Sequence, residues 1–121
     1  MATNILIADD SPSVRKFVTF ALKMKGYKVT VACDGMDALE KIPQDEFDLI
    51  ITDLNMPNVD GFELIQTIRS NEQYSSIPII ILTSMQNETE KEKGYTLGEN
   101  SYLVKPFNVQ KIQYEVAKYL N

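Results

Sequence analysis

Short runs of β-branched and other apolar residues alternate with amphipathic stretches along the chain. Five such runs predict strands, at 5–7, 29–31, 49–51, 79–82 and 102–104. The runs in the middle of the chain are almost continuously apolar, which is typical of a parallel sheet covered on both faces. The pattern therefore predicts buried strands that are connected by helices.

The stretches between these strands repeat their apolar residues at helical spacing. The repeating positions are Val14, Phe17, Val18, Ala21 and Leu22, then Ala38, Leu39 and Ile42, then Leu64, Ile65 and Ile68, and finally Val109, Ile112, Val116 and Leu120. A fourth helix within 87–97 is mostly polar, with Tyr95 and Leu97 as its clearest apolar residues. The (βα)5 order and right-handed crossovers predict one doubly wound α/β domain over residues 1–121.

The composition of the chain excludes several kinds of catalytic and metal-binding site. The chain of 121 residues has a net charge of −5, no histidine and a single cysteine, Cys33. Catalytic triads with histidine, histidine-ligated zinc and a phosphohistidine carrier are therefore excluded, and so is an internal disulfide. The acidic balance disfavours nucleic acid and anionic membranes as direct partners. With no secretory signal or membrane-length apolar run, we expect a cytoplasmic protein.

Polar residues follow or end four of the five predicted strands. The first strand is followed by Asp9 and Asp10, the third by Asp53, the fourth by Thr83 and the fifth by Lys105. Binding sites in doubly wound sheets form at the carboxyl ends of the strands. With the first strand beside the third, these four ends would lie side by side, so the sequence predicts one shared site.

Three crowded carboxylates repel one another unless a cation shares their site. Ligands that are all oxygen, with room left for water, favour Mg²⁺. Thr83 and Lys105 can bind phosphoryl oxygens, and an Asp carboxylate can itself act as the nucleophile. Asp53 stands alone at the end of a central strand, so we expect Asp53 to form an aspartyl phosphate while Asp9 and Asp10 hold the metal.

Four segments of the chain carry a family resemblance: ILIADD, LIITDLNMPNVDGFEL, IPIIILTS and YLVKPF. Together they resemble the response-regulator receiver domain (CheY-like) of two-component signalling, over almost all of 4–120. The resemblance implies a flavodoxin-like three-layer sandwich, with a parallel five-stranded sheet in the order 2-1-3-4-5.

The resemblance also implies a role for each site residue. Asp53 would be the phosphoacceptor, Lys105 would bind the phosphoryl group, and Thr83 and Tyr102 would be the switch hydroxyl and the switch aromatic. The Mg²⁺ ligands would be Asp9, Asp10, Asp53 and the backbone carbonyl of Asn55. Pro106 follows Lys105 as in the family's Lys-Pro pair, whose bond is usually cis.

A receiver domain takes its phosphoryl group from a histidine kinase or a histidine phosphotransfer protein. The resemblance implies that phosphorylation switches the face formed by the fourth helix, the fifth strand and the last helix, which a downstream target protein reads. The domain would not be an enzyme beyond its own phosphotransfer and autodephosphorylation. We expect a stand-alone regulator of the chemotaxis or motility type, with a receiver excised from a larger transcriptional regulator as the alternative.

Three alternative classes of protein differ from this chain in specific residues. A haloacid-dehalogenase-type phosphatase has a second acid two residues after its nucleophile, where this chain has Asn55. A pseudo-receiver tends to lack an acid, the threonine or the lysine, and none is missing here. A flavin mononucleotide carrier is disfavoured because Asp9 and Asp10 occupy the place of its phosphate cradle.

Taken singly, each residue also fits a purely structural role, such as a helix cap at Asp9 to Pro12. Glu99 departs from the family, where a small apolar residue is common.

Overall fold

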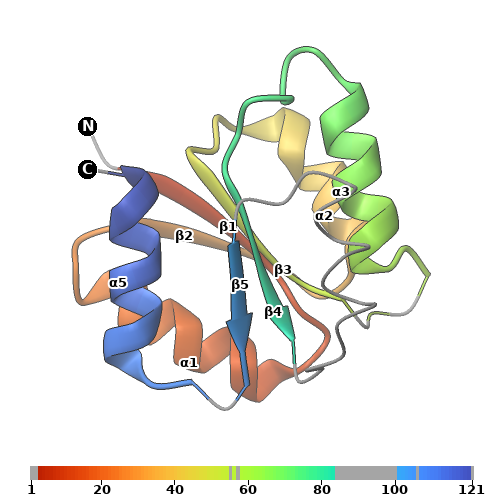
Figure 1. Ribbon diagram of the computed structural model, residues 1–121. Helices are drawn as coiled ribbons and strands as arrows, with labels where there is room; N and C mark the ends of the chain where they lie inside the picture. The colour runs from red at the N-terminus through yellow and green to blue at the C-terminus, as the bar shows by residue number, and fades with distance from the viewer. Residues whose placement is uncertain (1–2, 55, 57, 84–100, 106, 121) are drawn as a thin grey trace.

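The computed structural model describes residues 3–54, 56, 58–83, 101–105 and 107–120 (Figure 1). The elements follow in the order β1 (Asn4–Ala8), α1 (Pro12–Lys23), β2 (Lys28–Ala32), α2 (Gly35–Lys41), the 3₁₀ helix η1 (Ile42–Gln44), β3 (Leu49–Asp53), α3 (Gly61–Ser70), β4 (Ile79–Thr83), β5 (Ser101–Val104) and α5 (Val109–Leu120). The five predicted strands are confirmed. The helix expected within 87–97 lies outside the described residues.

All five strands pair in parallel, in the order β2-β1-β3-β4-β5. This order confirms the doubly wound α/β sandwich. Helices α1 and α5 cover one face of the sheet, and α2 and α3 cover the other (Figure 1). In the part of the chain that the structure describes, none of the helices has the length and apolar character needed to cross a membrane.

The central strands are buried on both faces. Alternate side chains of β1 point to opposite faces, so Leu6 packs in the core beneath α2 and α3, while Ile5 and Ile7 pack in the core beneath α1 and α5. Every residue of β1, β3 and β4 is buried. Burial on both faces explains why these strands read as continuous apolar runs.

Side-chain caps fix where the helices begin. The Ser11 hydroxyl accepts the Val14 N–H at 3.3 Å at the start of α1, and Asp34 accepts the Asp37 N–H at 2.8 Å at the start of α2. At α3, Asp60 caps the Glu63 N–H in the same way, at 2.9 Å. Each cap satisfies a backbone donor that the helix leaves unpaired. All three caps follow the carboxyl end of a strand, so they set the path of the loops there.

Two details of the helices differ from the prediction. The helical spacing predicts Phe17 on the apolar face of the first helix, yet Phe17 is 38% exposed, with its ring centroid 6.2 Å from that of Phe107. The second helix ends at Lys41, before Ile42, and continues as η1, which contains Pro43. A proline lacks the N–H that the α-helical ladder needs, so the helix changes form there.

Substituting a core residue of β1 should destabilise the fold. We expect Leu6→Ala to lower the free energy of unfolding by about 2–5 kcal/mol, because it removes a fully buried side chain and leaves a cavity. Val31→Ala on the edge strand, where Val31 is 38% exposed, should cost less than about 1 kcal/mol. Urea denaturation followed by circular dichroism measures both, and equal losses would contradict the assignment of Leu6 to the core.

Candidate functional site

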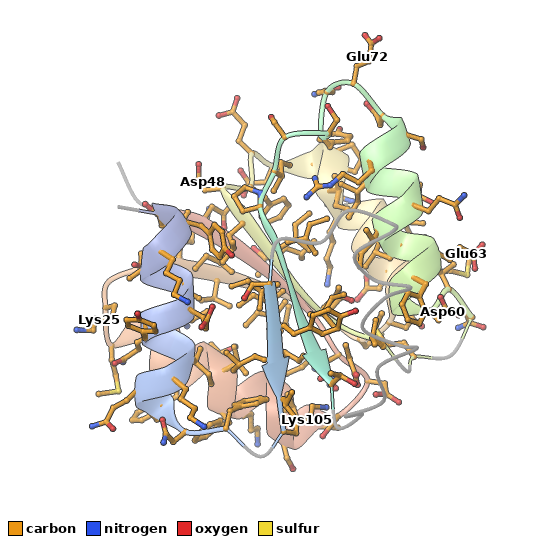
Figure 2. All side chains as sticks on the ribbon, in the orientation of Figure 1. Lys25, Asp48, Asp60, Glu63, Glu72 and Lys105 are labelled. Carbon is orange, nitrogen blue, oxygen red and sulfur yellow. The ribbon has the colours of Figure 1, made fainter. Side chains whose placement is uncertain are left out.

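The register of the sheet aligns the strand ends that carry polar residues. Ala8 at the end of β1 pairs with Thr52, Asp53 at the end of β3 pairs with Leu82, and Thr83 at the end of β4 pairs with Val104. Lys105 follows directly, at the carboxyl end of β5, while Asp48 lies at the opposite edge of the sheet (Figure 2). Asp9, Asp53, Thr83 and Lys105 therefore meet at the edge of the sheet that is formed by the carboxyl ends of the strands.

Three carboxylates converge there. One carboxylate oxygen from each of Asp9, Asp10 and Asp53 lies within 4.8 Å of the others. Asp9 is fully buried and Asp53 is only 6% exposed, whereas Asp10 is exposed at the rim. Carboxylates at this spacing repel one another, and burial of two of them weakens the screening by water.

The Lys105 ammonium compensates part of this charge. Its Nζ lies 3.4 Å from Asp9 Oδ2 and 3.4 Å from Asp53 Oδ2. The Lys105 backbone N–H also donates to the Thr83 carbonyl at 2.6 Å, which fixes the start of the chain after β5 against β4. Lys105 thus pairs with two of the three carboxylates, and a single ammonium charge cannot neutralise three carboxylate charges, so a further cation could bind at the cluster.

The backbone and carboxylate of Asp9 are held by its neighbours. Its N–H donates to the Ala32 carbonyl at 3.2 Å, and its Oδ1 accepts the Ser11 N–H at 2.8 Å. The Arg15 guanidinium donates to the Asp9 carbonyl oxygen at 2.8 Å. This role of Arg15 was not predicted from the sequence, because a basic residue in the second turn of a helix is usually solvated and no local motif marks it. These bonds leave Asp9 Oδ2 facing the shared site.

Thr83 and Tyr102 lie on the same face of the sheet. Thr83 is 1% exposed and has the same alternation as Ile79 and Ile81, which pack in the core beneath α2 and α3. Tyr102 pairs with Ile81 and is partly buried against that core. The threonine and the tyrosine are thus diagonal neighbours on adjacent strands. The predicted ligand Asn55 and residue Pro106 lie outside the described residues.

The donor set suits a hard cation. All three clustered side chains offer oxygen, and the chain contains no histidine and only one cysteine, the exposed Cys33. Mg²⁺ prefers one or two carboxylates together with water, and exposed Asp10 leaves one side of the cluster open to solvent. The same edge presents an ammonium group, as an anion such as a phosphoryl group would need.

A family model described as the response regulator receiver domain matches residues 5–117. The chain belongs to this family. The chemotaxis protein CheY4 of Vibrio cholerae is a solved structure similar to this receiver domain, with a TM-score of 0.94 and 37% sequence identity, covering 98% of this chain and 99% of that one. The family and the fold class predicted from the sequence are thereby confirmed.

Two further relatives are sensor proteins. EvgS of Escherichia coli K12 is 44% identical over 115 residues, which are 95% of this chain and 9% of EvgS, so this receiver domain spans a small part of that relative. The receiver domain of sensor histidine kinase PA1611 from Pseudomonas aeruginosa PAO1 has 29% identity and a TM-score of 0.91, covering 99% of this chain and 98% of that one. That structure has a magnesium ion coordinated in its active site cleft.

Removing one carboxylate from the cluster should stabilise the metal-free receiver domain. We expect Asp10→Asn, measured in chelator, to raise the midpoint of thermal unfolding by roughly 2 °C, because it relieves repulsion from Asp9 and Asp53. Asp60→Asn is the matched control, since asparagine also caps a helix and Asp60 caps α3 outside the cluster. Differential scanning calorimetry compares the variants. A midpoint that falls in Asp10→Asn would show that repulsion among the carboxylates does not destabilise the fold.

Proposed function

We propose that this receiver domain accepts a phosphoryl group on Asp53 from the phosphohistidine of a sensor kinase or a histidine phosphotransfer protein. The observation that carries the proposal is the convergence of Asp53 with Asp9, Asp10 and Lys105 at one edge of the sheet. A carboxylate oxygen of Asp53 attacks phosphorus, the bond between phosphorus and the donor imidazole breaks, and the imidazole leaves with that electron pair. Positioning and charge neutralisation dominate this chemistry, and the receiver needs no histidine of its own for them.

The carboxylates of Asp9, Asp10 and Asp53 would hold Mg²⁺ together with the backbone carbonyl of Asn55. When bound, the metal supplies positive charge that offsets the phosphoryl oxygens. The buried Asp9 is pre-oriented for this role by the Ser11 N–H and the Arg15 guanidinium. Asp10 at the rim would reach the ion from the solvent side.

Lys105 and Thr83 would bind the phosphoryl oxygens once Asp53 is modified. Lys105 already contacts Asp53 Oδ2 at 3.4 Å, so a small movement of its ammonium serves the new group. Thr83 would turn toward the phosphoryl group and leave space for Tyr102, its diagonal neighbour on β5. This change shifts a two-state equilibrium and alters the face made by the segment 87–97, β5 and α5, where a downstream target protein binds.

The similarity to CheY4, a chemotaxis protein of which the match covers 99%, supports a stand-alone regulator of the chemotaxis or motility type. The similarity to EvgS, of which the match covers 9%, supports the alternative of one domain in a larger signalling protein. In either setting residues 1–121 act as one receiver domain, whose reactions are its own phosphotransfer and the hydrolysis of its own acyl phosphate.

Phosphorylation should depend on Asp53 and on Mg²⁺. We expect the wild type to gain one phosphoryl group from a small-molecule phosphodonor only with Mg²⁺ present, and Asp53→Asn to gain none, because the amide is not a nucleophile. Asp10→Ala should still react but at least about tenfold more slowly, since a metal ligand is lost. Intact-protein mass spectrometry measures all three proteins.

Circular dichroism is the folding control for these variants. A folded wild type that gains no adduct would mark the chain as a pseudo-receiver. An unchanged rate in Asp10→Ala would refute the assignment of Asp10 to the metal.

Lys105 should matter for the response rather than for the metal. We expect Lys105→Ala to bind Mg²⁺ at least as tightly as the wild type, because it removes a cation that faces Asp9 and Asp53. After phosphorylation, the amide NMR shifts of β4 and β5 should change less than in the wild type. Lys111→Ala on α5 is the control, since Lys111 is exposed. Mg²⁺ binding weakened by more than about tenfold would contradict this role.

A further inference from the structure

The start of α2 contacts the loop after β3 near the end of the loop that leads into α3. This loop follows Asp53, contains Asn55, and leads through Asn58 and Val59 to α3. Neither Asp34 nor Gly35, which begin α2, belongs to the carboxylate cluster. Both nevertheless contact the loop, and these contacts suggest a role in positioning the phosphoacceptor.

Gly35 meets the loop without any side chain between them. A Cβ atom built on Gly35 would lie 2.1 Å from the Val59 carbonyl oxygen and 2.7 Å from Val59 Cβ. Contacts below 3.0 Å are essentially never tolerated by a Cβ atom, so the two backbones would have to separate by about 1 Å to admit one. The buried Gly35 therefore sets how closely the loop approaches α2.

Asp34 makes a second connection. Its Oδ1 accepts the Asp37 N–H at 2.8 Å and caps α2, while its Oδ2 accepts a bond from the Asn58 side-chain amide at 3.2 Å. Asn58 has a φ of 67°, a left-handed conformation that asparagine tolerates better than most residues. One carboxylate thus ties the first turn of α2 to the turn in the loop.

The start of α2 is itself anchored to the sheet. Lys41 Nζ donates to the Val31 carbonyl at 2.6 Å and to Asp37 Oδ2 at 3.1 Å. The Cys33 N–H donates to Asp37 Oδ2 at 3.0 Å, and this bond lowers the pKa of Asp37. A lowered pKa keeps this carboxylate ionised at neutral pH, so the anchor persists there. The loop is therefore braced against β2 through α2.

Just after Val59, the start of α3 lies against Asp53. The Gly61 N–H donates to the Leu54 carbonyl at 3.0 Å. A Cβ atom on Gly61 would lie 2.3 Å from the Asp53 carbonyl oxygen, so α3 begins directly against the peptide of the phosphoacceptor. A displacement of Val59 therefore reaches Asp53 through two residues of tightly packed backbone.

We propose that Gly35 is a positioning residue for phosphotransfer, because its close contact with Val59 fixes the backbone that leads into α3 and so holds Asp53 in place for the metal and the phosphoryl group. The inference rests on the proposed function. Gly35 does not belong to the carboxylate cluster and would not contact the phosphoryl group. It acts through the loop, and a misplacement of about 1 Å at a reacting group can cost about a hundredfold in rate.

The test compares Gly35→Ala with Gly26→Ala. Gly26 has a φ of 83° and no atom within 4 Å of a Cβ placed on it, so alanine there strains the backbone and lowers stability away from the site. For Gly35→Ala we expect the phosphorylation rate at saturating Mg²⁺ to fall at least about tenfold. The amide NMR shifts of residues 53–61 should also change. For Gly26→Ala we expect a lower unfolding midpoint with the wild-type rate and wild-type shifts at 53–61.

A second variant, Asp34→Ser, tests the proposal if the Gly35→Ala protein does not fold. Asp34→Ser keeps a capping hydroxyl for α2 but removes the oxygen that accepts from Asn58. It should shift the amides of 58–61 and reduce the rate by a smaller factor. Unchanged amide shifts in folded Gly35→Ala, or an unchanged rate at saturating Mg²⁺, would overturn the proposal; if Gly35→Ala does not fold, unchanged shifts in Asp34→Ser would do so. If the wild type takes no phosphoryl group, the proposed function fails, while the amide shifts of residues 53–61 still decide whether Gly35 positions the loop.

Discussion

The register of the parallel sheet is the constraint on which the site depends. Every residue of β1, β3 and β4 is buried, so each strand has apolar side chains on both faces and is packed between two layers of helices. Slipping one strand by a single residue would exchange its faces and misalign its end. Apolar packing along the strands thus determines where Asp9, Asp53 and Lys105 stand, although none of the three contributes to the apolar core.

The charged edge works against this packing. Two buried carboxylates and a third at the rim lie close together, and Lys105 pairs with the two buried ones; this crowding of like charges costs folding free energy that the apolar core offsets. Hydrogen bonds hold Asp9 in this arrangement, because the Ser11 N–H binds its carboxylate and its own N–H binds the Ala32 carbonyl. The Asp9 carboxylate therefore cannot turn away from the neighbouring carboxylates. A site held in this way would need little rearrangement to bind the Mg²⁺ and the phosphoryl group that we propose for it.

Much of this arrangement could be predicted from the sequence. The strands followed from apolar runs, and the convergence of Asp9, Asp53 and Lys105 followed from the rule that sites form at the carboxyl ends of parallel strands. The order 2-1-3-4-5 came from the family resemblance, since local patterns carry no information on which strands are neighbours. The contact of Gly35 with Val59, the bond from Arg15 to Asp9 and the exposure of Phe17 could not be predicted, because each depends on how separate elements pack. The structure brings Asp9, Asp10, Asp53 and Lys105 together, but the metal, phosphoacceptor and switch roles of these residues and of Thr83, Tyr102 and Asn55 stay predictions.

The bond from Lys41 to the Val31 carbonyl has a consequence for association between molecules. Strand β2 lies at an edge of the sheet, and an edge strand offers its unpaired backbone groups to any extended chain that approaches it. The Lys41 ammonium occupies one of these acceptors, and the same strand carries a second lysine, Lys28, whose ammonium pairs with Asp45 at 3.4 Å. A second sheet edge that approached β2 would have to displace a lysine and desolvate its charge. The brace on α2 therefore also protects the protein from edge-to-edge aggregation.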